Sequence, residues 1–228
     1  MALKILFLGA PGVGKGTFAK RIAPALGITH FSAGDCLREQ VKRETDIGNL
    51  AVSFLKKGSL VPGDLVVRMM NAKVAELQSN MRSYKGYLLD GFPRLLEQAE
   101  LWDSTGDGPP QLVVNITLDE AVLLKKISSR RICQSCGDNY NLADIRNRGY
   151  DMPPMLPKSP GICDSCGGVL VQREDDKEDI VRRRLDLHNK THGSLIDYYR
   201  DRSNILDFEV TRGVSQTDEL LSLIKSRL

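Results

Sequence analysis

The chain has 228 residues, and its 32 Lys and Arg residues against 29 Asp and Glu residues leave a formal net charge of +3. This balance argues against a protein that holds nucleic acid by bulk electrostatics, so an anionic partner must be bound locally. No apolar run approaches the roughly 20 residues that a membrane helix needs, and we expect no membrane partner.

Short apolar runs alternate with helix-like stretches along the chain. Branched apolar residues that follow one another without alternation predict strands, covered on both faces, at residues 3–8, 87–89, 112–116 and 206–210. Apolar residues at helical spacing predict helices at residues 15–26, 63–77, 95–102, 119–131, 176–202 and 215–228. Strands that alternate with helices predict a three-layer α/β fold, with a central parallel sheet flanked by helices.

Two segments interrupt this order. Residues 32–62 have helical patterns but no strand, and residues 131–173 contain paired cysteines with several prolines and glycines. We expect both to be lobes inserted into a core domain formed by residues 1–31, 63–130 and 174–228.

The segment 9–17 reads Gly-Ala-Pro-Gly-Val-Gly-Lys-Gly-Thr, after the first strand and before a helix. Glycines let backbone amides converge on an anion, the helix N-terminus adds partial positive charge, and Lys15 adds a full one. A glycine-rich turn without a ligand is disfavoured by the flanking strand and helix. The residues that we expect around a bound triphosphate are Gly12, Val13, Gly14, Lys15, Gly16 and Thr17.

Gly16 stands where the generic phosphate loop has a magnesium-binding Ser or Thr, and Thr17 follows it. The Gly-Lys-Gly-Thr ending resembles the loop of nucleoside monophosphate kinases. Over essentially the whole chain, the sequence resembles the adenylate kinase family. The resemblance implies a fold like that of P-loop nucleoside triphosphate hydrolases, an AMP-binding lobe at 32–62 and a lid at 131–173. It also implies the Mg²⁺-dependent reaction ATP + AMP = 2 ADP.

The acceptor side of the resemblance lies in the segments 32–38, 58–62 and 87–94. It implies that Arg38 and Arg94 bind the AMP phosphate and that Gln98 reads the adenine edge. Asp90 ends a buried strand, where a carboxylate can hold magnesium through water, although an aspartate at such a position can also be a helix cap. Ala33 replaces a hydroxyl residue that is common in this lobe, which loosens the detail of AMP binding. The full set implied for AMP is Ala33, Arg38, Ser59, Leu60, Val61, Gly91, Arg94, Gln98, Arg173 and Arg184.

Three further arginines match family positions that surround the triphosphate and the transferring phosphoryl group: Arg130, Arg173 and Arg184. Phosphoryl transfer needs this charge to neutralise the donor phosphates and the moving group, and no general base is required. By the same resemblance, Asp175 and Asp176 pair with lid arginines on closure, and Lys126 lies where many members stack an arginine on the donor base. The expected catalytic set is Lys15, Asp90, Arg94, Arg130, Arg173 and Arg184. The three histidines, His30, His188 and His192, are interpreted as ordinary core or surface residues.

Four of the five cysteines form two pairs, Cys133 with Cys136 and Cys163 with Cys166. Two such knuckles can close a tetrahedral thiolate site, and a four-thiolate zinc leaves no open position, so we expect a structural Zn²⁺ in the lid. Two disulfides, or reduced thiols without metal, are the alternatives. Cys36 belongs to neither pair.

Two other functions remain open. The segment 172–177 resembles the lid junction of a GTP:AMP phosphotransferase, so the partners expected are ATP or GTP with AMP and ADP. A P-loop switch protein with a zinc-ribbon interaction module is the more distant alternative. We expect a cytoplasmic monomer. The ending Ser226-Arg227-Leu228, similar to a peroxisomal address, makes a peroxisome-like organelle an alternative, and a mitochondrion is another.

Overall fold

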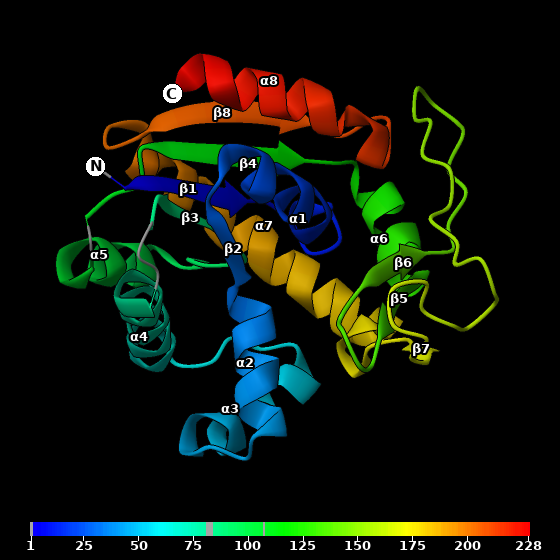
Figure 1. The fold of residues 1–228 in the computed structure, drawn as a ribbon, viewed down its shortest axis with the longest axis horizontal. Coiled ribbons are helices and arrows are strands. Elements are labelled where there is room, and N and C mark those ends of the chain that lie inside the picture. Colours follow the sequence, from blue (N-terminus) through cyan, green and yellow to red (C-terminus); the bar gives the residue numbers. More distant parts are fainter. Residues whose placement is uncertain (1, 81–83, 107) are drawn as a thin grey trace.

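The computed structural model describes residues 2–80, 84–106 and 108–228. Its main sheet has five parallel strands in the order β2-β3-β1-β4-β8. The strands are β1 (Leu3–Leu8), β2 (Thr29–Ser32), β3 (Gly86–Asp90), β4 (Leu112–Thr117) and β8 (Asn204–Glu209). The predicted parallel α/β fold is confirmed (Figure 1). β2 was not predicted, because this short edge strand has only one buried residue, Phe31.

Helices cover both faces of this sheet. Along β1, Ile5 and Phe7 belong to one hydrophobic cluster, while Leu6 and Leu8 belong to another, as side-chain alternation in a strand requires. The first cluster includes α1 (Lys15–Leu26), α6 (Glu120–Ser128) and α8 (Thr217–Arg227). The second includes α4 (Gly63–Asn80) and α5 (Leu96–Thr105), and the long α7 (Glu178–Arg200) contributes to both. The molecule therefore has three layers (Figure 1).

The first inserted segment is a pair of helices, α2 (Ala33–Lys42) and α3 (Asp46–Lys57). Thr45 caps α3 by accepting a 3.1 Å hydrogen bond from the backbone N–H of Gly48. Position 48 requires glycine, since a Cβ there would lie 2.1 Å from the carbonyl oxygen of Gln40. The pair is thus closely packed and projects from one side of the sheet (Figure 1).

The second inserted segment contains a small antiparallel sheet in the order β6-β5-β7. Its strands are β5 (Arg130–Cys133), β6 (Asn139–Asn141) and β7 (Leu170–Val171), and the 3₁₀ turn η1 (Glu174–Asp176) follows. Between β6 and β7, Ile145 pairs with Met152. Both side chains are buried in the hydrophobic cluster of α1 and α8, so this part of the expected lid packs on the core.

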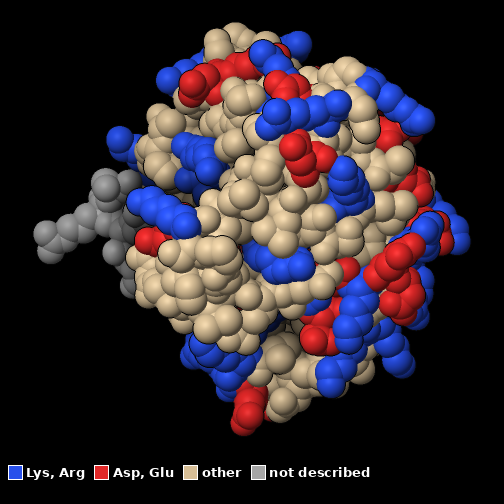
Figure 2. All heavy atoms as spheres, turned by 90° about the vertical axis from the view of Figure 1, so that its right-hand side faces the viewer, with Lys and Arg blue, Asp and Glu red and all other residues tan. Residues whose placement is uncertain are grey.

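The surface agrees with the balanced composition. On the face that carries the small sheet, Lys and Arg side chains lie among Asp and Glu side chains (Figure 2). Within the ranges that the structure describes, no helix is both long enough and apolar enough to cross a membrane. The short 3₁₀ turn η2 (Gly213–Gln216) leads from β8 into α8, which ends at Arg227.

Candidate active site

The phosphate loop joins β1 to α1 at the carboxyl edge of the main sheet. Gly12 and Gly14 have φ values of 83° and 110°, a region that L side chains rarely adopt. At Gly12 a Cβ would also lie 2.2 Å from the Ile127 side chain. The glycines therefore shape the loop and let it sit tightly against α6.

Lys15 points back over this loop. Its Nζ donates hydrogen bonds of 2.8 Å and 2.9 Å to the carbonyl oxygens of Gly9 and Ala10. Burial lowers the pKa of Lys15 to about 7; the carboxylate of Asp90 acts in the opposite direction, and nearby arginines lower this pKa further. A multiply charged anion in the cleft would restore the ordinary pKa, so the loop is suited to phosphate.

Asp90 ends β3 beside the loop, where doubly wound sheets place ligand chemistry. The distance between His30 Nε2 and Asp90 Oδ2 is 2.8 Å, and both side chains are nearly buried. The same oxygen would lie 3.4 Å from a Cβ at position 16, so Gly16 leaves room for the carboxylate. His30 therefore contacts a predicted site residue, although it is not among the residues that line the cleft.

The arginines predicted for the site line one cleft with Lys15: Arg38, Arg94, Arg130, Arg173 and Arg184. Arg94 donates from Nε to the carbonyl oxygen of Gly91 at 2.8 Å, and burial lowers its pKa to about 10. Burial also lowers the pKa of Arg173 to about 10, and its buried Nε has no hydrogen-bond partner among the residues that the structure describes. Closely spaced guanidinium groups repel each other, so this arrangement favours a bound anion.

Two acidic residues hold part of the cluster in place. Asp176 has no exposed surface and accepts from Arg130 through Nε at 2.8 Å and through a second guanidinium nitrogen. Asp175 accepts from Arg184 at 2.9 Å, through both its side chain and its backbone carbonyl. Arg130 belongs to the small sheet, whereas Arg184 lies on α7. The two aspartates therefore connect the second inserted segment to the core.

All the predicted AMP-side residues except Arg173 line a second, adjoining cavity. Arg94 and Gln98 are joined there by a 2.8 Å hydrogen bond from the Arg94 backbone N–H to the Gln98 side chain. Arg38 pairs with Asp35 one turn earlier on α2. The predicted residues that line this cavity are Ala33, Arg38, Ser59, Leu60, Val61, Gly91, Arg94, Gln98, Asp175 and Arg184.

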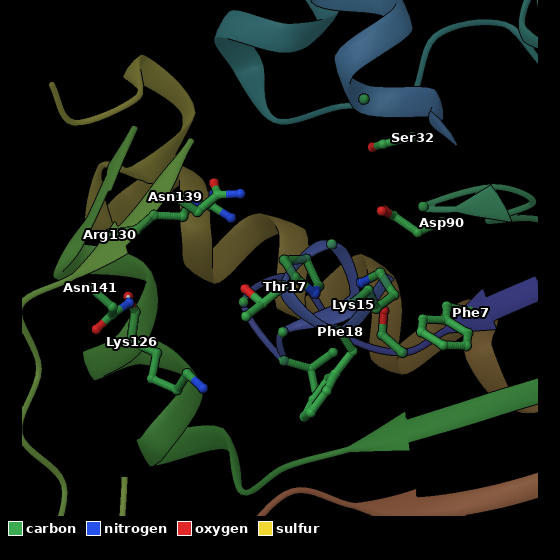
Figure 3. Close-up of a pocket in the computed structure, with 18 of the residues that line it drawn as sticks. Phe7, Lys15, Thr17, Phe18, Ser32, Asp90, Lys126, Arg130, Asn139 and Asn141 are labelled. Carbon is green, nitrogen blue, oxygen red and sulfur yellow. The ribbon is translucent and has the colours of Figure 1, made fainter. Parts of the chain in front are cut away.

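Two asparagines of β6 that the sequence did not single out, Asn139 and Asn141, also line the cleft. Arg130 and Asn139 reach from the small sheet towards Thr17, and Asp90 faces them from the other side (Figure 3). Asn141 donates to the backbone carbonyl of Lys126 at 2.8 Å. Asn139 and Asn141 carry no motif, and only their position on β6 brings them to the cleft.

Two histidines of α7 also line the cleft, which the sequence did not predict. His192 and Asn115 are 2.8 Å apart, and Asn115 donates to Asp207 at 2.7 Å. Because a carboxylate only accepts, Asn115 must direct its amide nitrogen to Asp207, which leaves its amide oxygen facing His192. His192 therefore donates to this oxygen from Nε2. The His188 ring lies 4.4 Å from that of His192, and burial lowers its pKa to about 3. Both imidazoles are therefore neutral near pH 7.

The four paired cysteines form one cluster, with all sulfur atoms within 4.8 Å of one another. Cys133 and Cys166 are 3.4 Å apart, and Cys136 and Cys163 are 3.6 Å apart. Zn–S bonds of about 2.3 Å in a tetrahedron place sulfurs about 3.8 Å apart, so the donor set fits a zinc ion. A side chain at Gly168 would lie 2.8 Å from the Cys133 sulfur, which explains a glycine at this turn.

The phosphate loop at the carboxyl edge of a parallel sheet places the protein in the P-loop class of nucleotide-binding proteins, and the arginines around it suit phosphoryl transfer. The family model described as adenylate kinase matches residues 7–204. The chain is 37% identical to an adenylate kinase of Methanocella arvoryzae over 229 residues, which cover 99% of this chain and 98% of that protein. It is 38% identical to an adenylate kinase of Thermosipho melanesiensis, with 98% and 100% covered.

It is also 35% identical to a GTP:AMP phosphotransferase of Plasmodium falciparum over 226 residues, which cover 97% of this chain and 96% of that protein. The chain belongs to the adenylate kinase family. It is therefore a phosphotransferase that acts on a nucleoside monophosphate.

Proposed function

We propose that this protein transfers the terminal phosphoryl group of Mg²⁺-bound ATP to AMP and releases two ADP molecules. The observation that carries the proposal is the single cleft in which Lys15 and five arginines meet, with a second cavity on one side for a monophosphate. A phosphate donor and a phosphate acceptor both need such neutralisation, whereas a nucleotide switch needs it for one nucleotide only.

In the proposed complex, backbone amides of the loop and the Lys15 ammonium hold the donor phosphates. Arg38 and Arg94 hold the AMP phosphate, and Gln98 contacts the adenine edge. Asp90 holds the Mg²⁺ that enters with the donor, through water molecules. Residues Gly12, Val13, Gly14, Gly16 and Thr17 form the rest of the donor cradle, and Ala33, Ser59, Leu60, Val61 and Gly91 form the rest of the acceptor pocket.

The transfer step follows from this placement. An ionised phosphate oxygen of AMP attacks the terminal phosphorus of ATP in line. The bond between that phosphorus and the oxygen that bridges it to the rest of ATP breaks, so ATP and AMP both become ADP. Arg130, Arg173 and Arg184 neutralise the moving group and the leaving oxygen. No proton has to be removed from the attacking oxygen, so no general base is assigned.

We assign residues 32–62 as the AMP-binding lobe and residues 131–173 as a lid that excludes water, with residues 1–31, 63–130 and 174–228 as the core. Support comes from the 3.5 Å contact between Arg173 and Asp35, which joins the two lobes across the cleft. Asp175 and Asp176 already pair with Arg184 and Arg130, and we assign these pairs to the closed lid. A structural Zn²⁺ held by the four paired cysteines would keep the lid rigid, because that lobe has little apolar core of its own.

GTP is the second candidate donor, because the relative from Plasmodium falciparum is a GTP:AMP phosphotransferase. We propose a cytoplasmic monomer that uses no nucleic acid or membrane partner.

The test is ADP formation by the purified protein with Mg²⁺, AMP and each of ATP, GTP and ITP. AMP-dependent turnover with ATP is expected. Turnover with GTP and not with ATP would replace the proposed donor, and no AMP-dependent turnover with any donor would reject the proposal.

A further inference from the structure

Gly58 ends α3, at the point where the first inserted segment returns to the core. Its φ of 70° lies in the left-handed region, and the backbone N–H of Ser59 donates to the carbonyl oxygen of Phe54 at 2.9 Å. This is a common way to close the last turn of a helix, and it favours glycine. The cap alone would therefore indicate nothing beyond a helix end.

The end of α3 also rests directly on α7. A Cβ at position 58 would lie 2.7 Å from Cγ2 of Ile180 and 3.2 Å from Cγ of Arg184. It would also lie 3.3 Å from the carbonyl oxygen of Ile180, which cannot swing away as a side chain can. Ile180 and Arg184 are four residues apart and so share one face of α7. The missing side chain at position 58 is what lets the two helices touch at this face.

This contact lies where the main cleft and the acceptor cavity adjoin. Gly58 and Arg184 both line each of the two, and the residues after Gly58, 59–61, line the acceptor cavity. The Arg184 guanidinium is held by two hydrogen bonds of 2.9 Å to Asp175. The seat of Gly58 on α7 therefore sets how far the wall of the acceptor cavity lies from a fixed guanidinium group.

We propose that Gly58 is a positioning residue for phosphoryl transfer: its bare backbone seats the AMP-binding lobe on α7 and brings AMP within reach of Arg184. A side chain there would push the lobe from α7 by roughly 1 Å before an ordinary carbon–carbon separation is restored. In-line transfer is sensitive to a displacement of that size. The inference rests on the proposed function, because it takes AMP as the acceptor.

The experiment compares Gly58→Ala with Gly27→Ala. Gly27 is the matched control, because it ends α1 with a φ of 67°, and a Cβ there would meet only ordinary contact, 3.6 Å from the flexible Lys85 side chain. Both variants carry the backbone strain of a left-handed alanine, so both should lose roughly 2–4 °C of Tm or more.

Only Gly58→Ala should affect the reaction. Steady-state kinetics should show kcat/KM for AMP lower by about ten- to a hundredfold. Calorimetry should show the AMP Kd raised about tenfold, as for the loss of one charge-assisted hydrogen bond. The Kd of ATP measured without AMP should stay within about twofold, because the phosphate loop and Lys15 hold the donor phosphates.

A second substitution tests whether the contact with α7 is the cause. Ile180→Ala removes the Cγ2 atom that a Cβ at position 58 would meet, so in that background Gly58→Ala should raise the AMP Kd by less than about threefold. If Gly58→Ala fails to fold, Gly58→Asn and its control Gly27→Asn take the place of the alanine pair, because asparagine adopts the left-handed region more readily.

Three results would overturn the inference: an AMP Kd that Gly58→Ala leaves unchanged, an equal rise in Gly27→Ala, or an undiminished rise in the Ile180→Ala background. Absent AMP-dependent turnover in the unsubstituted protein would instead reject the proposed function, while the AMP Kd values would still test the seat of the lobe on α7.

Discussion

Replacing Asp176 by Asn perturbs the link between the small sheet and α7. Asp176 is fully buried, accepts a bidentate contact from Arg130 and lies 3.7 Å from Arg184. The carboxylate holds the pKa of Arg130 above its usual range, although burial alone would lower it. The substitution leaves two guanidinium groups near each other without their shared counter-charge.

The magnitude follows from the burial of this pair. Removing one partner of a buried ion pair costs about 3–5 kcal/mol, and the lower end applies because 18% of the Arg130 side chain remains exposed. A loss of about 3 kcal/mol lowers Tm by roughly 6–12 °C in a chain of this size. Tripolyphosphate should restore more of the lost Tm in Asp176→Asn than it adds to the original protein, since it supplies the missing negative charge to Arg130.

Thermal unfolding followed by circular dichroism measures both effects. Asp179→Asn is the control, because the pair of Asp179 with Arg183 lies on the same helix with side chains 68% and 58% exposed. That change should cost less than about 1 kcal/mol. A Tm of Asp176→Asn within about 1 °C of the original, or an equal loss in the control, would refute the role given to this carboxylate.

Three further predictions concern the cleft and the lid. Lys15 has a pKa of about 7 in this structure, and a triphosphate beside it should raise that pKa. Donor affinity should therefore be full below pH 7 and fall by up to about tenfold per pH unit above it. Calorimetry at pH 8 in two buffers should show proton uptake that Lys15→Met abolishes; equal donor affinity at pH 6.5 and 8.5 would contradict this. Arg38→Ala should raise the AMP KM by about tenfold or more and the ATP KM by less than about twofold, and a larger rise for ATP would misplace the AMP phosphate. Elemental analysis should find one zinc per chain, lost in Cys133→Ser with a lower Tm, whereas disulfide-linked, metal-free protein would exclude the thiolate site.

Much of the sheet could be predicted because its central strands are buried on both faces and therefore read as unbroken apolar runs. The phosphate loop and the cysteine pairs were visible for a related reason, since their chemistry requires particular residues at short spacing. β2 escaped detection because an edge strand with Thr29 and Ser32 at its ends has no such run.

The parts that were missed depend on contacts between distant residues. His30 meets Asp90 across 60 positions of the chain, and His192 meets Asn115 across 77. Nothing local to either histidine signals its partner. The burial of Met152 against Gly213 likewise arises only when the inserted segment folds back onto the core.

The most direct test of phosphoryl transfer between nucleotides uses one substrate. ³¹P NMR of the purified protein with ADP and Mg²⁺ alone follows the proposed reaction in reverse. Equal amounts of ATP and AMP should appear at the expense of ADP, until all three nucleotides are in equilibrium. Persistent ADP, or its conversion to AMP and inorganic phosphate, would contradict the account.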